Sequence, residues 1–268
     1  MKRSRHRMHC PIKLLSTDFD GTLHEESANP PVPHPAQKII GRLQSKGVIW
    51  VINTGRDLPS LLDSLDRARL QNQPDFVVTV EREIHERRDS AYVGLTEWNA
   101  RCGQAHERVF AQVRPDVPRL ADWINCRFKA KVYEDPYSPL CLIAQSSQDA
   151  DAIHEYLEGY CGGIPGLTVV RNHIYARLCH ADYNKGSALT EIARRLGVTP
   201  DGTVAAGDHL NDLPMLSTTR AKWLIAPSNA VEEVKTLVRQ QNGYVSDEPH
   251  GFGLACGLER IEANCFGD

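Results

Sequence analysis

Two carboxylates stand two residues apart in Ser16-Thr17-Asp18-Phe19-Asp20-Gly21-Thr22-Leu23, a stretch that follows the apolar run 12–15. Side chains alternate in an extended chain, so Asp18 and Asp20 project from the same face where the predicted strand ends. Gly21 lets the backbone turn sharply beside them. Two carboxylates this close repel each other, and unless a cation lies between them one must keep a proton. The spacing therefore predicts a catalytic arrangement rather than a packing one.

The simplest alternative is an ordinary turn rich in Asp and Gly after a buried strand. A calcium loop of the EF-hand type is a second alternative, but such a loop has Gly at its sixth position and Glu at its twelfth. Counted from Asp18, Gly21 is fourth and Asn29 is twelfth. The spacing excludes an EF-hand, so the choice between a turn and a site depends on the rest of the chain.

The composition is that of an average globular protein, with 268 residues, 41% of them hydrophobic and 24% charged. The formal net charge of −3 predicts no affinity for nucleic acid or membranes, and no run of 18 apolar residues occurs. The basic tail Lys2, Arg3, Arg5 and Arg7 is the exception and is expected to be solvated. Eight cysteines without a Cys-x-x-Cys pair indicate a reduced, cytoplasmic protein with no structural zinc. We expect a monomer or a weak homo-oligomer.

The first 80 residues alternate between strand and helix patterns. Apolar runs at 12–15, 48–52 and 76–80 predict buried strands, and helical spacing at 36–43 and 58–65 predicts the helices between them. This alternation indicates a parallel α/β sheet. The same pattern returns after residue 180, with a helix over 185–196 and strands at 203–206 and 223–225. A last helix, capped by Ser228 or Asn229, is expected to run through Val238 and end near Gly243.

Residues 85–180 interrupt this pattern with helices and strands of their own, and their number is that of a domain. We therefore expect an α/β fold in two parts. Residues 1–84 and 181–268 form a Rossmann-like core with a doubly wound parallel sheet, and residues 85–180 form an inserted α+β domain.

Polar clusters follow three of the predicted strands and begin one helix: Asp18 and Asp20, Thr54 and Arg56, Asp208 and Asp212, and Lys185. In open α/β sheets, ligands bind at the carboxyl ends of the strands, where these clusters would meet. Carboxylates suit a hard cation such as Mg²⁺, and a lysine with free backbone N–H groups suits a phosphoryl group.

Four motifs stand in the order Asp18-Phe19-Asp20-Gly21-Thr22-Leu23, Asn53-Thr54-Gly55-Arg56, Lys185-Gly186 and Gly207-Asp208-x-x-Asn211-Asp212. In order and spacing they resemble the haloacid dehalogenase-like (HAD) superfamily, in its branch with a large α/β cap between the second and third motifs. That branch includes the Cof-type sugar-phosphate phosphatases and sucrose-phosphate phosphatase. The resemblance covers about residues 12–84 and 180–262, and it implies that the inserted domain is a cap that sets substrate specificity.

The resemblance implies a role for each motif residue. Asp18 would be the nucleophile that accepts the phosphoryl group, and Asp20 would be the acid and then the base. Magnesium would be held by Asp18, the backbone carbonyl of Asp20 and Asp208, with Asp212 acting indirectly. The phosphoryl oxygens would be held by Thr54, the Gly55 N–H, Asn211 and Lys185.

Several neighbouring residues have open roles. Arg56 could contact the phosphate or substrate, or it could form a structural ion pair. His24 and His209 are expected to line the site or lie on the surface. Within the cap, residues that could touch the leaving group are Tyr137, Arg171, Asn172, His173 and Arg177.

One stretch departs from the Cof-type pattern. Many Cof-type members have Asn-Gly-Ala after the third strand, whereas this chain has Glu81-Arg82-Glu83-Ile84. That is nearer the Gly-x-Glu-Ile associated with sucrose- and trehalose-phosphate phosphatases. The substrate and the entry to the cap are left open by this difference.

The resemblance implies a magnesium-dependent phosphatase that hydrolyses a small phosphate monoester, with a sugar phosphate preferred, through an aspartyl phosphate. A phosphomutase of the phosphomannomutase type on the same scaffold is the alternative. A non-catalytic binding module, with the basic tail touching nucleic acid, is more remote because Asp18, Asp20, Lys185 and Asp208 are all intact. The expected partner is a small-molecule phosphate ester.

Overall fold

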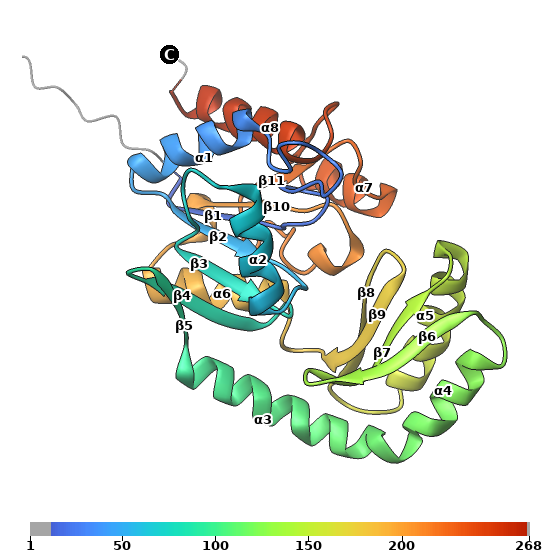
Figure 1. The fold of residues 1–268 in the computed structure, drawn as a ribbon. Helices are drawn as coiled ribbons and strands as arrows, with labels where there is room; N and C mark the ends of the chain where they lie inside the picture. The colour runs from blue at the N-terminus through green and yellow to red at the C-terminus, as the bar shows by residue number, and fades with distance from the viewer. Residues whose placement is uncertain (1–11, 267–268) are drawn as a thin grey trace, which may run out of the picture.

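The computed structural model describes residues 12–266, so the basic tail lies outside the described residues. The chain forms two sheets (Figure 1). The larger has eight strands in the order β12-β11-β10-β1-β2-β3-β4-β5, and the smaller has four in the order β6-β7-β9-β8.

Six strands of the larger sheet are parallel, as their continuous apolar sequences predict. In their register, Thr17 at the end of β1 lies beside Ile52 of β2 and Ala206 of β10. The segments that follow these three strands therefore emerge together at one edge. The six strands are β1 (Leu14–Thr17), β2 (Ile49–Asn53), β3 (Phe76–Thr79), β10 (Thr203–Ala206), β11 (Trp223–Ala226) and β12 (Tyr244–Val245).

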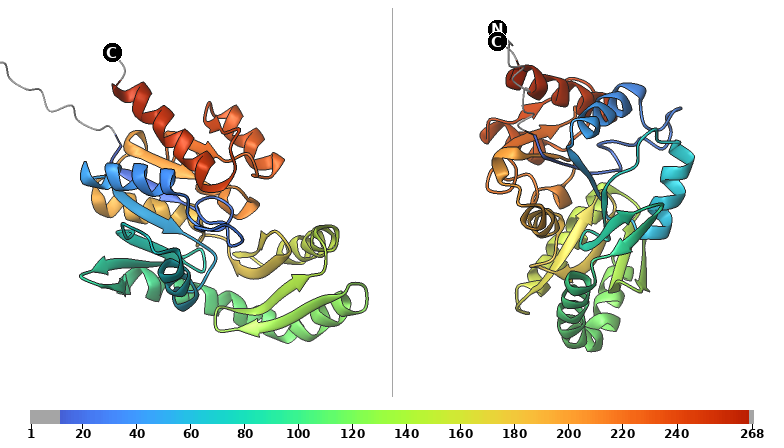
Figure 2. Two further views of the ribbon diagram at one scale, coloured as in Figure 1. Left: turned by 45° about the horizontal axis from the view of Figure 1, so that its top comes forward. Right: turned by 90° about the vertical axis from the view of Figure 1, so that its left-hand side faces the viewer.

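Helices cover both faces of this sheet (Figures 1 and 2). One face packs against α1 (His34–Ser45), α2 (Leu58–Ala68) and α8 (His250–Phe266). The other packs against α6 (Lys185–Leu196) and α7 (Glu232–Gln240). This two-sided packing confirms the predicted doubly wound α/β core. Short 3₁₀ turns lie at η2 (Pro200–Gly202) and η3 (Leu210–Asp212).

The chain between β3 and α6 first extends the larger sheet and then builds the smaller one. Strands β4 (Glu83–Arg88) and β5 (Ala91–Gly94) add to the edge of the larger sheet in antiparallel fashion. The smaller sheet is antiparallel and has its helices packed on one face. Its elements and the segments leading to it are α3 (Thr96–Val113), η1 (Arg114–Asp116), α4 (Val117–Asn125), β6 (Ala130–Asp135), β7 (Ser138–Ala144), α5 (Ser147–Cys161), β8 (Leu167–Asn172) and β9 (Tyr175–His180).

The boundary drawn at residue 85 does not match these sheets, because 85–94 pair within the larger sheet. Leu95 and Trp98 pack into the core of that sheet, and the Asn99 side chain bonds both backbone groups of Ile84. The smaller sheet, by contrast, shares a separate apolar cluster with α3, α4 and α5. We therefore propose that the cap begins after Asn99 and ends near Ala181.

Excision tests this boundary. Replacing residues 101–181 by a short Gly/Ser linker should leave a folded core, since the apolar cluster of the cap is separate. The truncated chain should hydrolyse nitrophenyl phosphate yet lose selectivity among natural esters. Circular dichroism and rates on several esters measure both properties. A chain that is unfolded after this excision would show that the two parts fold as one unit.

A buried histidine lies where the two parts join. His106 of α3 places its Nδ1 2.8 Å from Cys102 O, and its Nε2 accepts from the His180 N–H of β9 at 3.1 Å. Both ring nitrogens are used, so the ring is neutral with its proton on Nδ1. Burial, together with the charge of Arg82, lowers the pKa of His106 to about 3.

This histidine should make the fold sensitive to acid. Its folded-state pKa is below the usual 6.5, so its contribution to stability is complete above pH 6.5 and is lost as pH falls toward 3. From pH 7 to pH 5 the loss should reach up to about 2 kcal/mol. Urea unfolding at both pH values should show a smaller loss for His106→Gln than for wild type. The exposed His34→Gln is the control, and equal losses in all three proteins would contradict this role.

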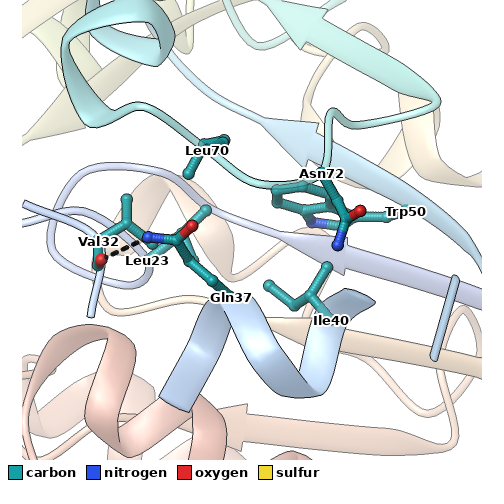
Figure 3. A pocket seen from close by; sticks show the side chains of 7 residues that line it. All are labelled: Leu23, Val32, Gln37, Ile40, Trp50, Leu70 and Asn72. Atoms are coloured by element: carbon teal, nitrogen blue, oxygen red, sulfur yellow. Dashed lines mark hydrogen bonds between the residues drawn. The ribbon is translucent and has the colours of Figure 1, made fainter. Parts of the chain in front are cut away.

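A small cavity lies beside α1 (Figure 3). It holds about 10 Å³ and is lined mainly by apolar side chains, among them Leu23, Ile40 and Trp50. Gln37 closes one side by donating to Val32 O at 2.9 Å. Its volume is about that of a single water probe, so it is a packing defect and not a ligand site. Within residues 12–266, no helix is both long and apolar enough to cross a membrane.

Candidate active site

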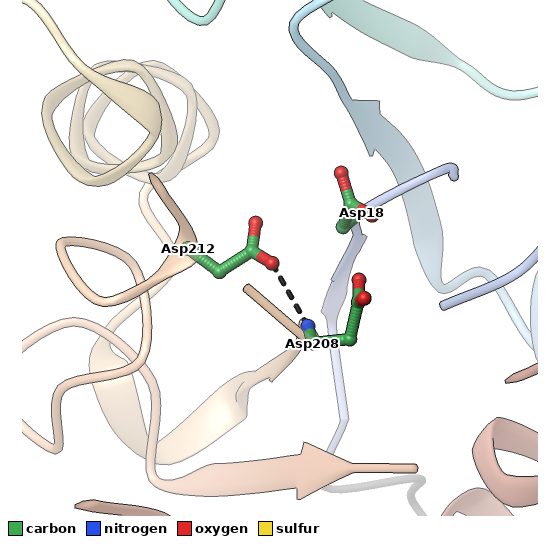
Figure 4. Close-up of side chains that lie close together, drawn as sticks. All are labelled: Asp18, Asp208 and Asp212. Atoms are coloured by element: carbon green, nitrogen blue, oxygen red, sulfur yellow. Dashed lines mark hydrogen bonds between the residues drawn. The ribbon is translucent and has the colours of Figure 1, made fainter. Parts of the chain in front are cut away.

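Three carboxylates converge at the ends of β1 and β10 (Figure 4). One oxygen from each of Asp18, Asp208 and Asp212 lies within 4.8 Å of the others. The register of β1 against β10 brings these residues together. The Asp18 N–H continues the hydrogen bonding between the two strands by donating to Ala206 O at 2.9 Å. The predicted meeting of the first and fourth motifs is observed.

Lys185, the first residue of α6, lies among these acids. Its Nζ is 2.5 Å from Asp18 Oδ1 and 2.6 Å from Asp212 Oδ1, and the side chain is fully buried. Burial alone would lower the pKa of Lys185, but the attraction of the two carboxylates raises it above its usual value. The Asn53 side chain donates to Lys185 O at 2.9 Å and so fixes the start of the helix. The lysine is therefore held as a cation.

One lysine does not balance three acids. Burial, and then the charges of Asp212 and Asp208, raise the pKa of Asp18 well above its usual value although Lys185 opposes them. Burial and the charge of Asp212 raise the pKa of Asp208 to about 7. A divalent cation would relieve this excess of negative charge, and an all-oxygen donor set is the kind that Mg²⁺ prefers. The residues present thus fit the metal implied by the resemblance.

The three acids differ in how many of their oxygens remain available. Asp212 uses Oδ1 for Lys185, and its Oδ2 accepts from the N–H groups of Asp208 and His209 at 2.8 and 3.0 Å. Asp208 accepts one hydrogen bond, from Thr22 Oγ1 at 2.8 Å. These contacts favour Asp18 and Asp208 as direct ligands and Asp212 as the residue that orients them.

Gly21 permits the close approach of the two loops. It has φ of +86°, which glycine alone adopts without strain, and a Cβ there would lie 2.4 Å from Asp208 Oδ2. A larger residue at this position would displace Asp208 from Asp18.

Asp20 lies apart from this cluster. Arg56 donates to both of its oxygens, from Nε and Nη2, each at 2.6 Å. Burial raises the pKa of Asp20, but His24 and Arg56 outweigh it and hold the pKa below its usual value. Of the two roles left open for Arg56, the structure shows the ion pair. His24 is not a surface residue, since it is buried and stacks on Phe19.

The other predicted phosphoryl-binding groups lie in the segments that follow β2 and β10, at the sheet edge where the acids meet. Thr54 is buried, and its Oγ1 accepts from the Arg56 N–H at 3.2 Å. The Gly55 N–H has no hydrogen-bond acceptor among residues 12–266. Asn211 donates to Glu81 Oε1 at 3.1 Å, while its buried Oδ1 has no partner in that part of the chain. A free backbone N–H and a buried lysine at one sheet edge are groups that suit a phosphoryl group.

Arg177 is one of the cap residues proposed to touch the leaving group, and its side chain donates to Gly55 O in the second motif at 2.7 Å. Among residues 12–266, no other side chain of that proposed set bonds a motif residue. Arg171 pairs with Asp151 instead. His173 bonds through its backbone N–H to the ring of His209, and burial lowers the pKa of His209 to about 4.

The profile of the haloacid dehalogenase-like hydrolase family matches residues 15–80 and 124–249. The chain belongs to this family. A phosphoglycolate phosphatase of Staphylothermus marinus is 24% identical over 255 residues, 93% of this chain and 98% of that protein. The phosphoglycolate phosphatase of Methanopyrus kandleri is 37% identical, but over 38% of this chain and 40% of its own length.

The sucrose-phosphatase of Synechocystis sp. PCC6803, solved with sucrose and phosphate, has the same fold with a TM-score of 0.66 and 20% identity. The match covers 93% of this chain and 98% of that one. The predicted HAD family and α/β class are thereby confirmed, as is the predicted enzyme class, a HAD-type phosphatase.

Glu81 lies in the candidate active site, although the four motifs do not include it. It contacts Asn211 and is 4% exposed, yet it belongs to none of the four motifs. The sign of it in the sequence is that residues 81–84 depart from the Asn-Gly-Ala that many Cof-type members have after the third strand.

Proposed function

We propose that this protein is a magnesium-dependent phosphatase that hydrolyses a small phosphate monoester, with a sugar phosphate as the favoured class. The observation that supports this most strongly is Lys185, buried between Asp18 and Asp212 with Asp208 beside them. A buried lysine and a surplus of carboxylates match the needs of phosphoryl transfer, where charge must be neutralised while a nucleophile attacks.

Magnesium would be held by Asp18, Asp208 and the backbone carbonyl of Asp20, and it would neutralise charge between the nucleophile and the phosphoryl group. Lys185, Thr54, Asn211 and the Gly55 N–H would hold the phosphoryl oxygens. These groups are fixed before substrate binds, so they need no reorganisation in the transition state.

The reaction proceeds in two steps. Asp18 attacks phosphorus and the ester P–O bond breaks, giving an aspartyl phosphate and a free alcohol. Asp20, which Arg56 otherwise holds as a carboxylate, must leave that pair and take up a proton before it protonates the leaving oxygen. Asp20 then takes a proton from water, whose oxygen attacks phosphorus and releases inorganic phosphate and Asp18. Arg56 keeps the Asp20 carboxylate in one orientation through two hydrogen bonds.

We also propose a cytoplasmic setting. The six cysteines for which the structure gives a state are free thiols, as expected in a reducing compartment: Cys102, Cys126, Cys141, Cys161, Cys179 and Cys256.

Phosphate release from a panel of esters tests the proposal. Purified protein with Mg²⁺ should release inorganic phosphate from several sugar phosphates and from nitrophenyl phosphate without any bisphosphate activator. Release from no ester would overturn the proposed function. Turnover that requires a bisphosphate would instead establish the phosphomutase alternative.

A further inference from the structure

Glu81 is held against the phosphoryl-binding loop by its backbone. It lies in the turn between β3 and β4, and its N–H donates to Thr54 O at 2.9 Å. The preceding Val80 N–H donates to Arg56 O at 2.8 Å. The turn is thus hydrogen-bonded to the second motif on both sides of Gly55. Any side chain at position 81 must lie beside the catalytic centre.

The conformation of this turn is unfavourable for the residues that occupy it. Val80 has φ of 44° and Glu81 has φ of 68°, both in the left-handed region. A β-branched residue is an outlier there, and two successive residues in this region usually read Asn-Gly. Backbone strain of this kind persists where the surrounding structure or the function requires a particular side chain. A glutamate that occupies a glycine conformation in the active site therefore has a use.

The carboxyl group of Glu81 faces both the core and the cap. Its Oε1 accepts from Asn211 Nδ2 at 3.1 Å, and its Oε2 has no hydrogen-bond partner among residues 12–266. A Cβ on Gly55 would lie 3.1 Å from Glu81 Oε1 and 3.6 Å from Arg177 Nη2. The carboxylate and the guanidinium thus flank the same glycine. Arg177 is buried and donates to Gly55 O, but its Nε has no partner among residues 12–266, and its charge acts on Glu81. One oxygen of Glu81 remains available.

A cavity of about 430 Å³ opens from Glu81 and Asn211 and extends between core and cap. Its walls include Thr168 of β8, whose hydroxyl can bond a hydroxyl group, and Asn184, whose side chain caps α6 and donates to Ala181 O. Of the charged residues that also line it, Arg171 is paired with Asp151, and Glu158 lies 3.7 Å from His154. The volume is within the range of small-molecule sites and far exceeds that of a two-carbon acid.

We propose that Glu81 determines substrate specificity: it accepts a hydrogen bond from a hydroxyl group of the leaving group in this cavity and rejects leaving groups that carry a carboxylate. The inference rests on the phosphatase function proposed above. A carboxylate accepts from hydroxyls and repels a second carboxylate. The substrate class is therefore a phosphorylated sugar or alditol, in contrast to the phosphoglycolate named for two relatives.

Two substitutions separate the hydrogen bond that Glu81 accepts from a substrate hydroxyl from its repulsion of a substrate carboxylate. Glu81→Gly removes the side chain and suits the positive φ, so its melting temperature should equal or exceed that of wild type. Glu81→Gln keeps the shape and removes the charge. The control is Glu86→Gln on β4, a partly exposed carboxylate paired with Arg88 and remote from the cavity lining.

The measurement is kcat/KM on a panel of hexose, pentose and alditol phosphates, on phosphoglycolate and on nitrophenyl phosphate. Wild type should prefer the best hydroxylated ester over phosphoglycolate. Glu81→Gly should lower kcat/KM for that ester about 10- to 100-fold while nitrophenyl phosphate changes less than about 3-fold. Glu81→Gln should raise the ratio of phosphoglycolate to sugar phosphate, and Glu86→Gln should leave it unchanged.

An equal loss on all esters in Glu81→Gly would overturn the inference, because Glu81 would then act through Asn211 alone. A wild-type preference for phosphoglycolate would overturn it as well, while leaving the phosphatase function intact. Wild type that releases phosphate from no ester would overturn both proposals together.

Discussion

Asp18→Asn should abolish phosphate release, with kcat reduced by about 10⁴-fold or more, as for the loss of a covalent nucleophile in other enzymes. The amide oxygen is neutral, a poor nucleophile and a weak metal ligand. The substitution should not unfold the protein, because it removes one of three mutually repelling acids and leaves Lys185 paired with Asp212. Phosphate release on nitrophenyl phosphate and a thermal melt test the two expectations.

The matched control is Asp63→Asn, an exposed residue paired with Arg67 on α2. It should retain wild-type activity. Activity of Asp18→Asn within about tenfold of wild type, together with a wild-type melting temperature, would contradict the assignment of the nucleophile.

Removal of the divalent metal should lower activity about as much as Asp18→Asn does. Three carboxylates share one lysine, so without a cation burial and the neighbouring acids keep the pKa of Asp18 raised and favour its protonated form, which is a poor nucleophile. Activity should vanish in excess EDTA and return with Mg²⁺. Calcium should inhibit, since its larger, higher-coordinate shell fits an octahedral site poorly. Undiminished activity in EDTA would contradict the proposed role of the metal.

Binding is measurable without turnover. A ligand that binds the folded state alone stabilises it by about 2.7 kcal/mol at 100 times its Kd, so Mg²⁺ should raise the melting temperature. Asp208→Asn should lose most of this shift. The control is Asp201→Asn, whose exposed carboxylate pairs with Lys222 away from the site. An unchanged shift in Asp208→Asn would place the metal elsewhere.

The parts of the fold that could be predicted are those set by local pattern. The helix expected over 185–196 is α6, ending before Gly197 in the left-handed conformation. The helices and strands expected within residues 85–180 include the hairpin β8–β9. Parallel strands bring their ends together by necessity, which is why Asp18 and Asp208 could be placed in one site from sequence.

Elements decided by long-range pairing could not be placed in this way. Residues 83–94 alternate weakly and carry four charges in their first six positions, which gives little sign that they extend the main sheet. The helix expected after Ser228 or Asn229 begins at Glu232 without a side-chain cap. Asn229 is used elsewhere, because it donates to Gly21 O and accepts from the His250 N–H.

The same limit applies within the site. Motif spacing brought Asp20 and Arg56 to one edge of the sheet but could not show that the guanidinium takes both carboxylate oxygens. Nor could it show Glu81 beside Asn211, since that contact depends on an unusual backbone conformation in the turn after β3.

The division of labour between the two aspartates of the first motif is tested most directly by trapping the intermediate in Asp20→Asn. This substitution keeps the backbone carbonyl and removes proton transfer, a loss on the order of 10²–10⁴-fold. Nitrophenolate needs little protonation to leave, whereas attack of water on the aspartyl phosphate still needs a base. We expect a burst of nitrophenolate followed by slow turnover, and acid quenching should leave phosphate on the peptide that contains Asp18. Wild-type turnover by the variant, or phosphate on any other residue, would contradict the account.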